Sequence, residues 1–247
     1  MSKLSRQYRR LRQGVQEAFG ATYELDGARF TLPSWADDIK RNIKRGHYEA
    51  AERRLVLQHL RPDLPVVELG GSFGIVSGVI ARRLAPMTPH IIVEANPLLI
   101  DYCRANATAP RGSGAPVTVI NAAIAYGVGA EVSFLQSGGF LGSRLAREGD
   151  SGTIRVPALQ LSALLAQHVP GQDYQLVCDI EGGELDMLIH DRDALQPCRS
   201  AMVEMHADVF AARGTSEAGF IAMLEAADLS VRERTDNVVF AARDLRE

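Results

Sequence analysis

The chain of 247 residues has few cysteines and no long apolar run. Its three cysteines, Cys103, Cys178 and Cys198, are far apart and form no Cys-x-x-Cys pair. This pattern indicates neither a disulfide framework nor a zinc site. No apolar run approaches the roughly 18 residues that span a bilayer, and no apolar signal core follows the basic start of the chain. We therefore expect a cytoplasmic protein without a transmembrane segment.

The sequence also lacks a large excess of one charge. Lys and Arg total 27 against 30 acidic residues, which gives a net charge of -3. Proteins that bind polyanions are usually basic, so nucleic acid is not the expected partner. One local exception is the basic start MSKLSRQYRRLRQG. Two interpretations fit it, a solvated helix face and peripheral contact with an anionic surface. The oligomeric state cannot be read from the sequence.

Repeats, low-complexity tracts and linkers rich in Pro, Gly or Ser are missing, so one main domain is expected. Residues 1–60 mix charged and apolar residues at helical spacing and predict an N-terminal helical cap. From 61 to 247, short apolar runs such as PVVEL, HIIVEA and QLVCDI alternate with helix-length segments. This alternation predicts an α/β domain with a mostly parallel sheet and right-handed crossovers.

Two segments depart from that alternation. AEVSFLQ and GTIRVPALQ are typical of strands, and the loop SGGFLGSRLAREGDSG between them predicts a mobile flap. Near the end, LSVRERTDNVVFAARD contains two strand-like runs that meet at residues 235–237 and predict a hairpin. An antiparallel hairpin that closes a parallel sheet is typical of the Rossmann-like class I methyltransferases.

The turn VVELGGSFG follows the first predicted strand, where open α/β sheets usually bind ligands. Its glycines let the main chain approach a ligand closely, beside the N–H groups of the next helix. A dinucleotide site needs Gly-x-Gly-x-x-Gly, and neither Gly70 nor Gly71 begins that pattern. The actual spacing is acid-x-Gly-x-x-x-Gly, which favours the cationic amino-acid end of S-adenosylmethionine. Taken alone, the turn also fits a tight bend without a ligand.

The ends of the next two predicted strands agree with a nucleoside site. HIIVEANP places Glu94 where a carboxylate can accept both ribose hydroxyls, although an acid ahead of Pro97 also suits a helix start. VTVINAAIA places Asn121, Ala122 and Ala123 at a strand end, where small side chains leave room for an adenine ring.

Six segments occur in an order that resembles the FkbM-type family of S-adenosylmethionine-dependent methyltransferases: VVELGGSFGIVS, VEANP, INAAIA, VPALQLSALL, LVCDIEGGELDML and MVEMH. The resemblance runs from about Tyr48 to His206, and DIEGGE is its most specific part. It implies methyl transfer to a hydroxyl of a saccharide, glycolipid or natural product. Three positions depart from the family: Glu68 replaces Asp, Gly71-Ser72 replaces Ala-Asn, and Val177 replaces a frequent lysine.

The resemblance and the strand ends together give the predicted site. The residues expected at the cofactor are Glu68, Gly70, Gly71, Ser72, Phe73, Gly74, Glu94, Ala95, Asn96, Asn121, Ala122, Ala123 and Asp179. Asp179, with His206 and Glu181, is the predicted catalytic group, because an acceptor hydroxyl must give up its proton during methyl transfer. These residue types also suit a divalent metal, and the sequence leaves that question open. The predicted substrate contacts are Tyr48, Glu49, Phe140, Ser143 and Arg144.

Three other functions compete with this interpretation. A cofactor-binding module without catalytic activity fits the same fold. Methylation of nucleic-acid bases is disfavoured, because the segment CDIEGG lacks the Asn/Asp-Pro-Pro-aromatic turn typical of that reaction. A nicotinamide oxidoreductase is disfavoured by the glycine spacing.

Overall fold

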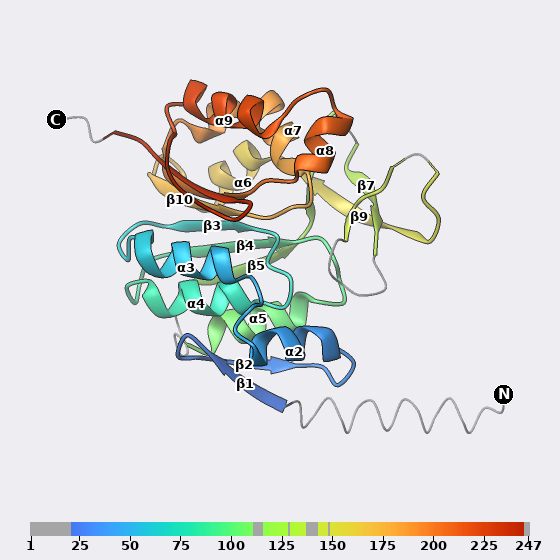
Figure 1. Ribbon diagram of the computed structural model, residues 1–247, viewed down its shortest axis with the longest axis vertical. Coiled ribbons are helices and arrows are strands. Elements are labelled where there is room, and N and C mark those ends of the chain that lie inside the picture. Colours follow the sequence, from blue (N-terminus) through green and yellow to red (C-terminus); the bar gives the residue numbers. More distant parts are fainter. Residues whose placement is uncertain (1–20, 111–115, 128, 137–142, 148, 245–247) are drawn as a thin grey trace.

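A seven-stranded sheet forms the centre of the protein in the computed structural model, which describes residues 21–110, 116–127, 129–136, 143–147 and 149–244 (Figure 1). Its strand order is β12-β13-β11-β10-β3-β4-β5. Five strands run parallel: β3 (Val66–Leu69), β4 (His90–Glu94), β5 (Val117–Asn121), β10 (Tyr174–Cys178) and β11 (Cys198–Glu204). The hairpin β12 (Ser230–Thr235) and β13 (Val238–Ala242) joins β11 antiparallel. The predicted Rossmann-like class I methyltransferase fold is confirmed.

One face of this sheet is covered by α6 (Leu161–His168), α7 (Gly183–His190) and α9 (Glu217–Ala226), which lie above it in Figure 1. Alternate strand residues supply the apolar contacts here, including Val67, Val93 and Leu176. Phe210 of the short helix α8 (Ala207–Ala212) stacks on Phe220 at 4.7 Å between ring centroids. Strands β3, β4 and β10 are buried along their whole length and are mostly apolar, which is typical of parallel strands.

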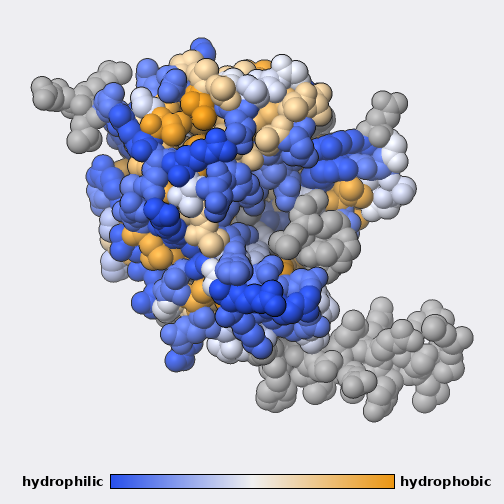
Figure 2. All heavy atoms as spheres, in the orientation of Figure 1, coloured by the Kyte–Doolittle hydropathy of each residue, from blue (hydrophilic) through white to orange (hydrophobic). Residues whose placement is uncertain are grey.

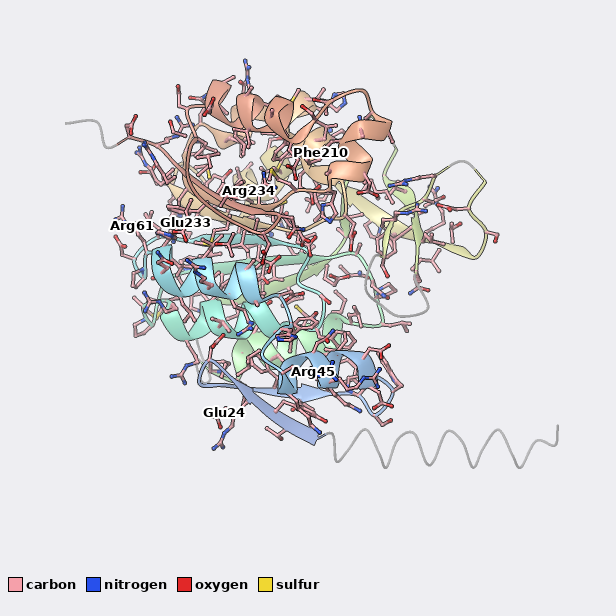
Figure 3. All side chains as sticks on the ribbon, in the orientation of Figure 1. Glu24, Arg45, Arg61, Phe210, Glu233 and Arg234 are labelled. Atoms are coloured by element: carbon pink, nitrogen blue, oxygen red, sulfur yellow. The ribbon has the colours of Figure 1, made fainter. Side chains whose placement is uncertain are left out.

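The opposite face carries α3 (Ala50–His59), α4 (Ile75–Arg83) and α5 (Ile100–Thr108) (Figure 1). Leu55 and Val79 pack there against strand residues such as Val66 and Val177. The C-terminal hairpin is tied to α3 through Glu233, which accepts hydrogen bonds from Arg54 and Gln58 (Figure 3).

The prediction of helix throughout residues 1–60 is wrong for Ala21–Leu32. These residues form the hairpin β1 (Ala21–Leu25) and β2 (Ala28–Leu32), followed by α2 (Asp37–Lys44). The two-residue turn is Asp26-Gly27, with φ of 50° and 74°, the conformation that Asp-Gly hairpins favour. In β2 alternate residues are buried, so a two-residue period outweighs the charged composition. Residues 1–20, including the basic start, lie outside the described residues.

The predicted pair of extra strands is confirmed and belongs to a second, smaller sheet. Its order is β6-β9-β7-β8, with β6 (Ala123–Ile124), β7 (Glu131–Leu135), β8 (Arg144–Leu145) and β9 (Thr153–Leu159). Strands β7 and β9 extend to one side of the molecule (Figure 1). Part of the predicted flap, 137–142 and 148, lies outside the described residues.

The outer surface is mainly hydrophilic on the face shown in Figure 2, where hydrophobic residues form separate groups. Within the described ranges, no helix has the length and apolar character to cross a bilayer. All three cysteines are buried and unpaired.

Candidate functional site

A cleft lies at the carboxyl ends of the central strands, between the main sheet and the small sheet. Seven of the predicted cofactor residues line it: Gly70, Ser72, Glu94, Ala95, Ala122, Ala123 and Asp179. Glu49, Ser143 and Glu181 line it as well. The cleft therefore brings together residues from three parts of the predicted site, as expected at this edge of an open α/β sheet.

The glycine turn shapes the floor of the cleft. Gly70 has a φ of 91°, and a β-carbon there would lie 1.7 Å from the carbonyl oxygen of Asp179. Gly74, at the start of α4, has a φ of 77° and lies close to α5, since its β-carbon would stand 2.7 Å from the Cys103 carbonyl oxygen. Only glycine fits both the dihedral angle and the space at these positions. Gly71, Gly74 and Phe73 thus build the turn but do not line the cleft.

Glu94 lies at the end of β4 and closes the turn from the neighbouring strand. Its Oε2 accepts a hydrogen bond of 2.7 Å from the Ser72 N–H, and its Oε1 accepts one of 2.6 Å from the Asn96 N–H. Burial raises the pKa of this carboxyl, and the two N–H donors oppose the shift. Each carboxylate oxygen can accept a second hydrogen bond, so Glu94 retains acceptor capacity toward the cleft.

Ala122 and Ala123 lie in the cleft wall, where small side chains were predicted. Asn121 supports this wall from behind, because its Nδ2 donates to the carbonyl oxygens of Glu94 and Ala95 at 2.9 and 3.0 Å. Asn96 is fully buried and accepts a hydrogen bond from the Gln136 side chain at 2.8 Å. Both asparagines therefore hold the strand ends in place and do not line the cleft.

Glu68 lies behind the turn, away from this cleft. Its carboxylate accepts from Ser77 Oγ at 2.7 Å and lies 2.7 Å from His90 Nε2. Both Glu68 and His90 are buried. Glu68 also borders a smaller hollow under the turn, together with Glu49, Glu52 and Asp179. The predicted contact of Glu68 with the cofactor remains a prediction.

Three residues other than glycine have positive φ angles and line the cleft. Glu49, Ser72 and Glu181 have φ values of 44°, 46° and 55°. Each such residue costs about 1–3 kcal/mol, and residues of this kind tend to occur at functional sites. The three residues come from separate segments of the chain, and their strained main-chain conformations all occur around this cleft.

A group of acidic residues surrounds His206 where β10 and β11 end. His206 Nε2 lies 3.3 Å from Glu181 Oε2 and 3.6 Å from Asp179 Oδ1, and His206 Nδ1 lies 3.4 Å from Glu184 Oε1. Burial raises the pKa of Asp179, and the charges of Glu204 and Glu184 add to the shift. The three predicted catalytic residues are thus neighbours.

The charge of His206 follows from these carboxylates. Burial lowers the pKa of the imidazole, but Glu181, Glu184 and Asp179 outweigh it and raise the pKa to about 11. Without another cation in place, His206 is therefore protonated at neutral pH. An imidazolium cannot take the proton of a substrate, so Asp179 is the better candidate for that role.

Only some of the predicted substrate contacts line the cleft. Glu49 and Ser143 line the cleft, whereas Tyr48 is buried behind it with its hydroxyl 3.5 Å from Ser72 Oγ. Arg144 is held by Asp150, to which its Nη1 donates at 2.7 Å. Phe140 lies outside the described residues.

The sequence interpretation missed the apolar wall of the cleft. This wall includes Ile124, Phe134, Leu145 and Ile180. Phe134 and Leu145 belong to β7 and β8, which pair with each other. The strand that contains Phe134 was predicted, but the pattern of a strand does not tell which of its faces meets another sheet. Leu145 was placed in the flap, and its strand β8 was not predicted.

A family model described as "Methyltransferase FkbM domain" matches residues 72–230, more than half of the chain. Among curated proteins no match to the chain is found. The solved structures that resemble it include magnesium protoporphyrin IX methyltransferase from Synechocystis PCC 6803 with bound SAH. That comparison has 12% identity and a TM-score of 0.48, and it covers 87% of this chain and 89% of the other.

Two further solved structures are similar at comparable levels. Precorrin-6y C5,15-methyltransferase from Geobacter metallireducens GS-15 has 16% identity and a TM-score of 0.44, with 80% of this chain and 89% of the other covered. A putative methyltransferase from Thermoplasma acidophilum has 13% identity and a TM-score of 0.44, with coverage of 91% and 81%.

Proposed function

The chain belongs to the FkbM methyltransferase domain family, and we propose that it transfers the methyl group of S-adenosylmethionine to a hydroxyl of a saccharide, glycolipid or natural product. The cofactor would lie across the strand ends. Its ribose would meet Glu94, its adenine would meet Ala122 and Ala123, and its amino-acid end would lie over the turn at Gly70. The acidic surroundings of that turn, which include Glu49 and Asp179, suit a sulfonium and an ammonium group.

The observation that carries the reaction is the position of Asp179. It lines the cleft, and its Oδ1 is buried without a hydrogen-bond partner in the part of the chain that the structure describes. A buried oxygen of this kind is costly to leave unpaired, so the Asp179 carboxylate suits a partner that enters the cleft.

The reaction can be written so that its atoms balance. The acceptor oxygen forms a bond to the methyl carbon while the carbon–sulfur bond breaks and its electrons pass to sulfur. The hydroxyl proton goes to Asp179. The products are a methyl ether and S-adenosylhomocysteine. What the protein supplies is alignment of the two reactants and a site for the proton.

The acceptor is proposed to be a small polar molecule or glycan rather than nucleic acid. The cleft is lined by the carboxylates of Glu49, Glu94, Asp179 and Glu181. Arg144, beside the cleft, is already paired with Asp150. Phosphates of a polynucleotide would meet negative charge here, whereas neutral hydroxyls find hydrogen-bond acceptors.

Transfer of a labelled methyl group to a panel of saccharide, glycolipid and polyketide acceptors tests this proposal. Asp179→Asn should still bind S-adenosylhomocysteine, with an affinity lowered less than about 10-fold by the loss of one nearby charge, but turn over at least about 100-fold more slowly. The matched control is Asp101→Asn, at an exposed position on α5, which should leave the rate unchanged. A wild-type rate in Asp179→Asn would refute the catalytic role.

A further inference from the structure

The side chains of Asp179, Glu181 and His206 are arranged like the ligands of a metal ion, and we propose that they bind one divalent cation, with Mn²⁺ the best match. The site itself follows from the geometry of these three residues. Its part in the reaction, holding the acceptor hydroxyl beside the methyl group, rests on the proposed function.

The three side chains converge on one point. One ligand atom from each lies within 4.8 Å of the others, and His206 Nε2 lies 3.3 Å from Glu181 and 3.6 Å from Asp179. Adjacent ligands of an octahedral ion with bonds of about 2.1 Å are about 3.0 Å apart. The two distances from His206 Nε2, 3.3 and 3.6 Å, are close to this spacing, and the separation between Asp179 and Glu181, which is at most 4.8 Å, would shorten as the two carboxylates turn toward the ion.

Hydrogen bonds within the protein do not satisfy these groups. Asp179 Oδ1 and His206 Nδ1 are both buried, and neither has a hydrogen-bond partner among the described residues. Although His206 lies within ion-pair distance of its neighbours, its contacts with Asp179 Oδ1 and Glu184 are not aligned as hydrogen bonds. A cation between Asp179 and His206 would give the buried Oδ1 a partner.

Glu184 distinguishes the group from an ordinary cluster of acids. It is fully buried, and its two oxygens accept hydrogen bonds from the N–H groups of Ile180 at 2.7 Å and Gly182 at 2.8 Å. The same carboxylate faces His206 Nδ1 at 3.4 Å. A histidine that binds a metal usually directs its other ring nitrogen to a carboxylate. When a small turn of the ring completes the hydrogen bond from Nδ1, Glu184 would keep the proton there and leave the Nε2 lone pair toward Asp179 and Glu181.

The donor set decides the kind of ion. Two carboxylates and one imidazole suit Mn²⁺ better than Mg²⁺, which prefers oxygen ligands alone, and no thiolate is available to favour a softer ion. Asp179 and Glu181 line the cleft, so the remaining coordination positions would face the acceptor. A bound cation lowers the pKa of a coordinated hydroxyl, and the second Asp179 oxygen would remain free to take the proton.

The test measures Mn²⁺ directly, without turnover. Full-length protein is freed of metal with a chelator, and Mn²⁺ binding is followed by electron paramagnetic resonance, while affinity for S-adenosylhomocysteine is measured separately as a check on folding. One site per chain is expected. His206→Gln should abolish it, and Glu184→Gln should weaken Mn²⁺ affinity about 10- to 100-fold. His47→Gln, at an exposed position, is the matched control and should bind like the wild type.

The outcomes separate the site from the reaction. If the wild type binds S-adenosylhomocysteine but no Mn²⁺ at millimolar concentration, or if His206→Gln retains the site, the inference is overturned while the proposed function stands. If Mn²⁺ binds as expected but metal-free enzyme methylates its acceptor at the full rate, the catalytic role of the ion is refuted.

Discussion

Gly70 and Asp179 meet at the floor of the cleft, where a β-carbon on Gly70 would lie 1.7 Å from the carbonyl oxygen of Asp179. The two residues end neighbouring parallel strands, β3 and β10, and the Asp179 N–H donates to the Leu69 carbonyl at 2.9 Å. The glycine turn and the proposed catalytic residue are therefore positioned by one another. In the proposed function, cofactor binding and catalysis would therefore depend on the same contact.

Gly70→Ala is expected to displace this turn. Alanine would combine a φ of 91° with a clash against main-chain atoms that cannot move aside easily. We expect S-adenosylhomocysteine affinity to fall at least about 10-fold and the free energy of unfolding to fall by about 2 kcal/mol or more. Titration calorimetry and chemical denaturation measure the two effects.

Gly171→Ala is the control for Gly70→Ala, because it has a φ of 66° but no atom within 4 Å of the new β-carbon. Gly171→Ala should lower the free energy of unfolding through its strained φ angle but leave the affinity for S-adenosylhomocysteine unchanged. Equal affinity losses in the two variants would contradict the role assigned to the Gly70–Asp179 contact.

Glu94→Gln should weaken cofactor binding with little change in the fold. The two carboxylate oxygens of Glu94 accept from the N–H groups of Ser72 and Asn96 and can still accept from a ribose. Glutamine has a single acceptor oxygen and cannot serve all of these donors. We expect the Kd for S-adenosylhomocysteine, and also for adenosine alone, to rise about 10-fold or more. If adenosine binds Glu94→Gln as well as it binds the wild type, Glu94 does not contact the ribose. The exposed Glu225 provides the control, Glu225→Gln.

Glu52 should make the stability of the protein depend on pH. Burial raises the pKa of this carboxyl from 4.5 to about 7, Glu204 adds to the shift, and Arg53 opposes it. The folded state therefore favours the protonated form. The contribution of protonated Glu52 to the free energy of unfolding is fully present below about pH 4.5 and is lost as the pH rises through about 7.

Glu52→Gln should remove the loss of stability that the ionisation of Glu52 causes at high pH. Relative to the wild type, the variant should gain about 2–3 kcal/mol of unfolding free energy between pH 5 and pH 8. Chemical denaturation at the two pH values measures the change, with Glu225→Gln as the control. The difference in unfolding free energy between Glu52→Gln and the wild type could instead stay the same at both pH values. That result would show that Glu52 has the same pKa in the folded and unfolded chains.

His90→Ala should be one of the most destabilising single substitutions. It would leave the buried Glu68 carboxylate with Ser77 as its remaining hydrogen-bond donor among the described residues. Removal of one partner of a buried pair costs about 3–5 kcal/mol. Glu68→Gln keeps a hydrogen-bond acceptor and should cost less. If denaturation curves show His90→Ala to be as stable as the wild type, the pair contributes nothing measurable.

Much of the fold could be predicted because its signals are local. The buried runs at β3, β4 and β10 are short and mostly apolar, and the hairpin of β12 and β13 is marked by Asp236-Asn237. The hairpin at Ala21–Leu32 was missed because its two strands are short and carry one charged residue each, and their burial depends on α4 and α5. Tertiary contacts there decide between a helix and a strand.

Only those residues of the site that lie at the ends of predicted strands could be identified from the sequence. Gly70, Glu94 and Asp179 follow predicted strands directly, and all three line the cleft. Glu68 was expected to reach the ligand, but its partner His90 comes from the start of another strand, and a register is needed to bring the two together. The contact of Glu184 with His206 likewise joins the first turn of α7 to the residue that precedes α8, and no spacing in the sequence reveals it.

The most direct test of the central claim, that the cleft holds S-adenosylmethionine, is titration calorimetry of the purified chain with S-adenosylhomocysteine and, in parallel, with NAD. The account predicts one site per chain with micromolar affinity for S-adenosylhomocysteine, no binding of NAD, and loss of the site in Gly70→Ala. Tight binding of NAD, or no binding of S-adenosylhomocysteine with or without acceptors, would contradict it.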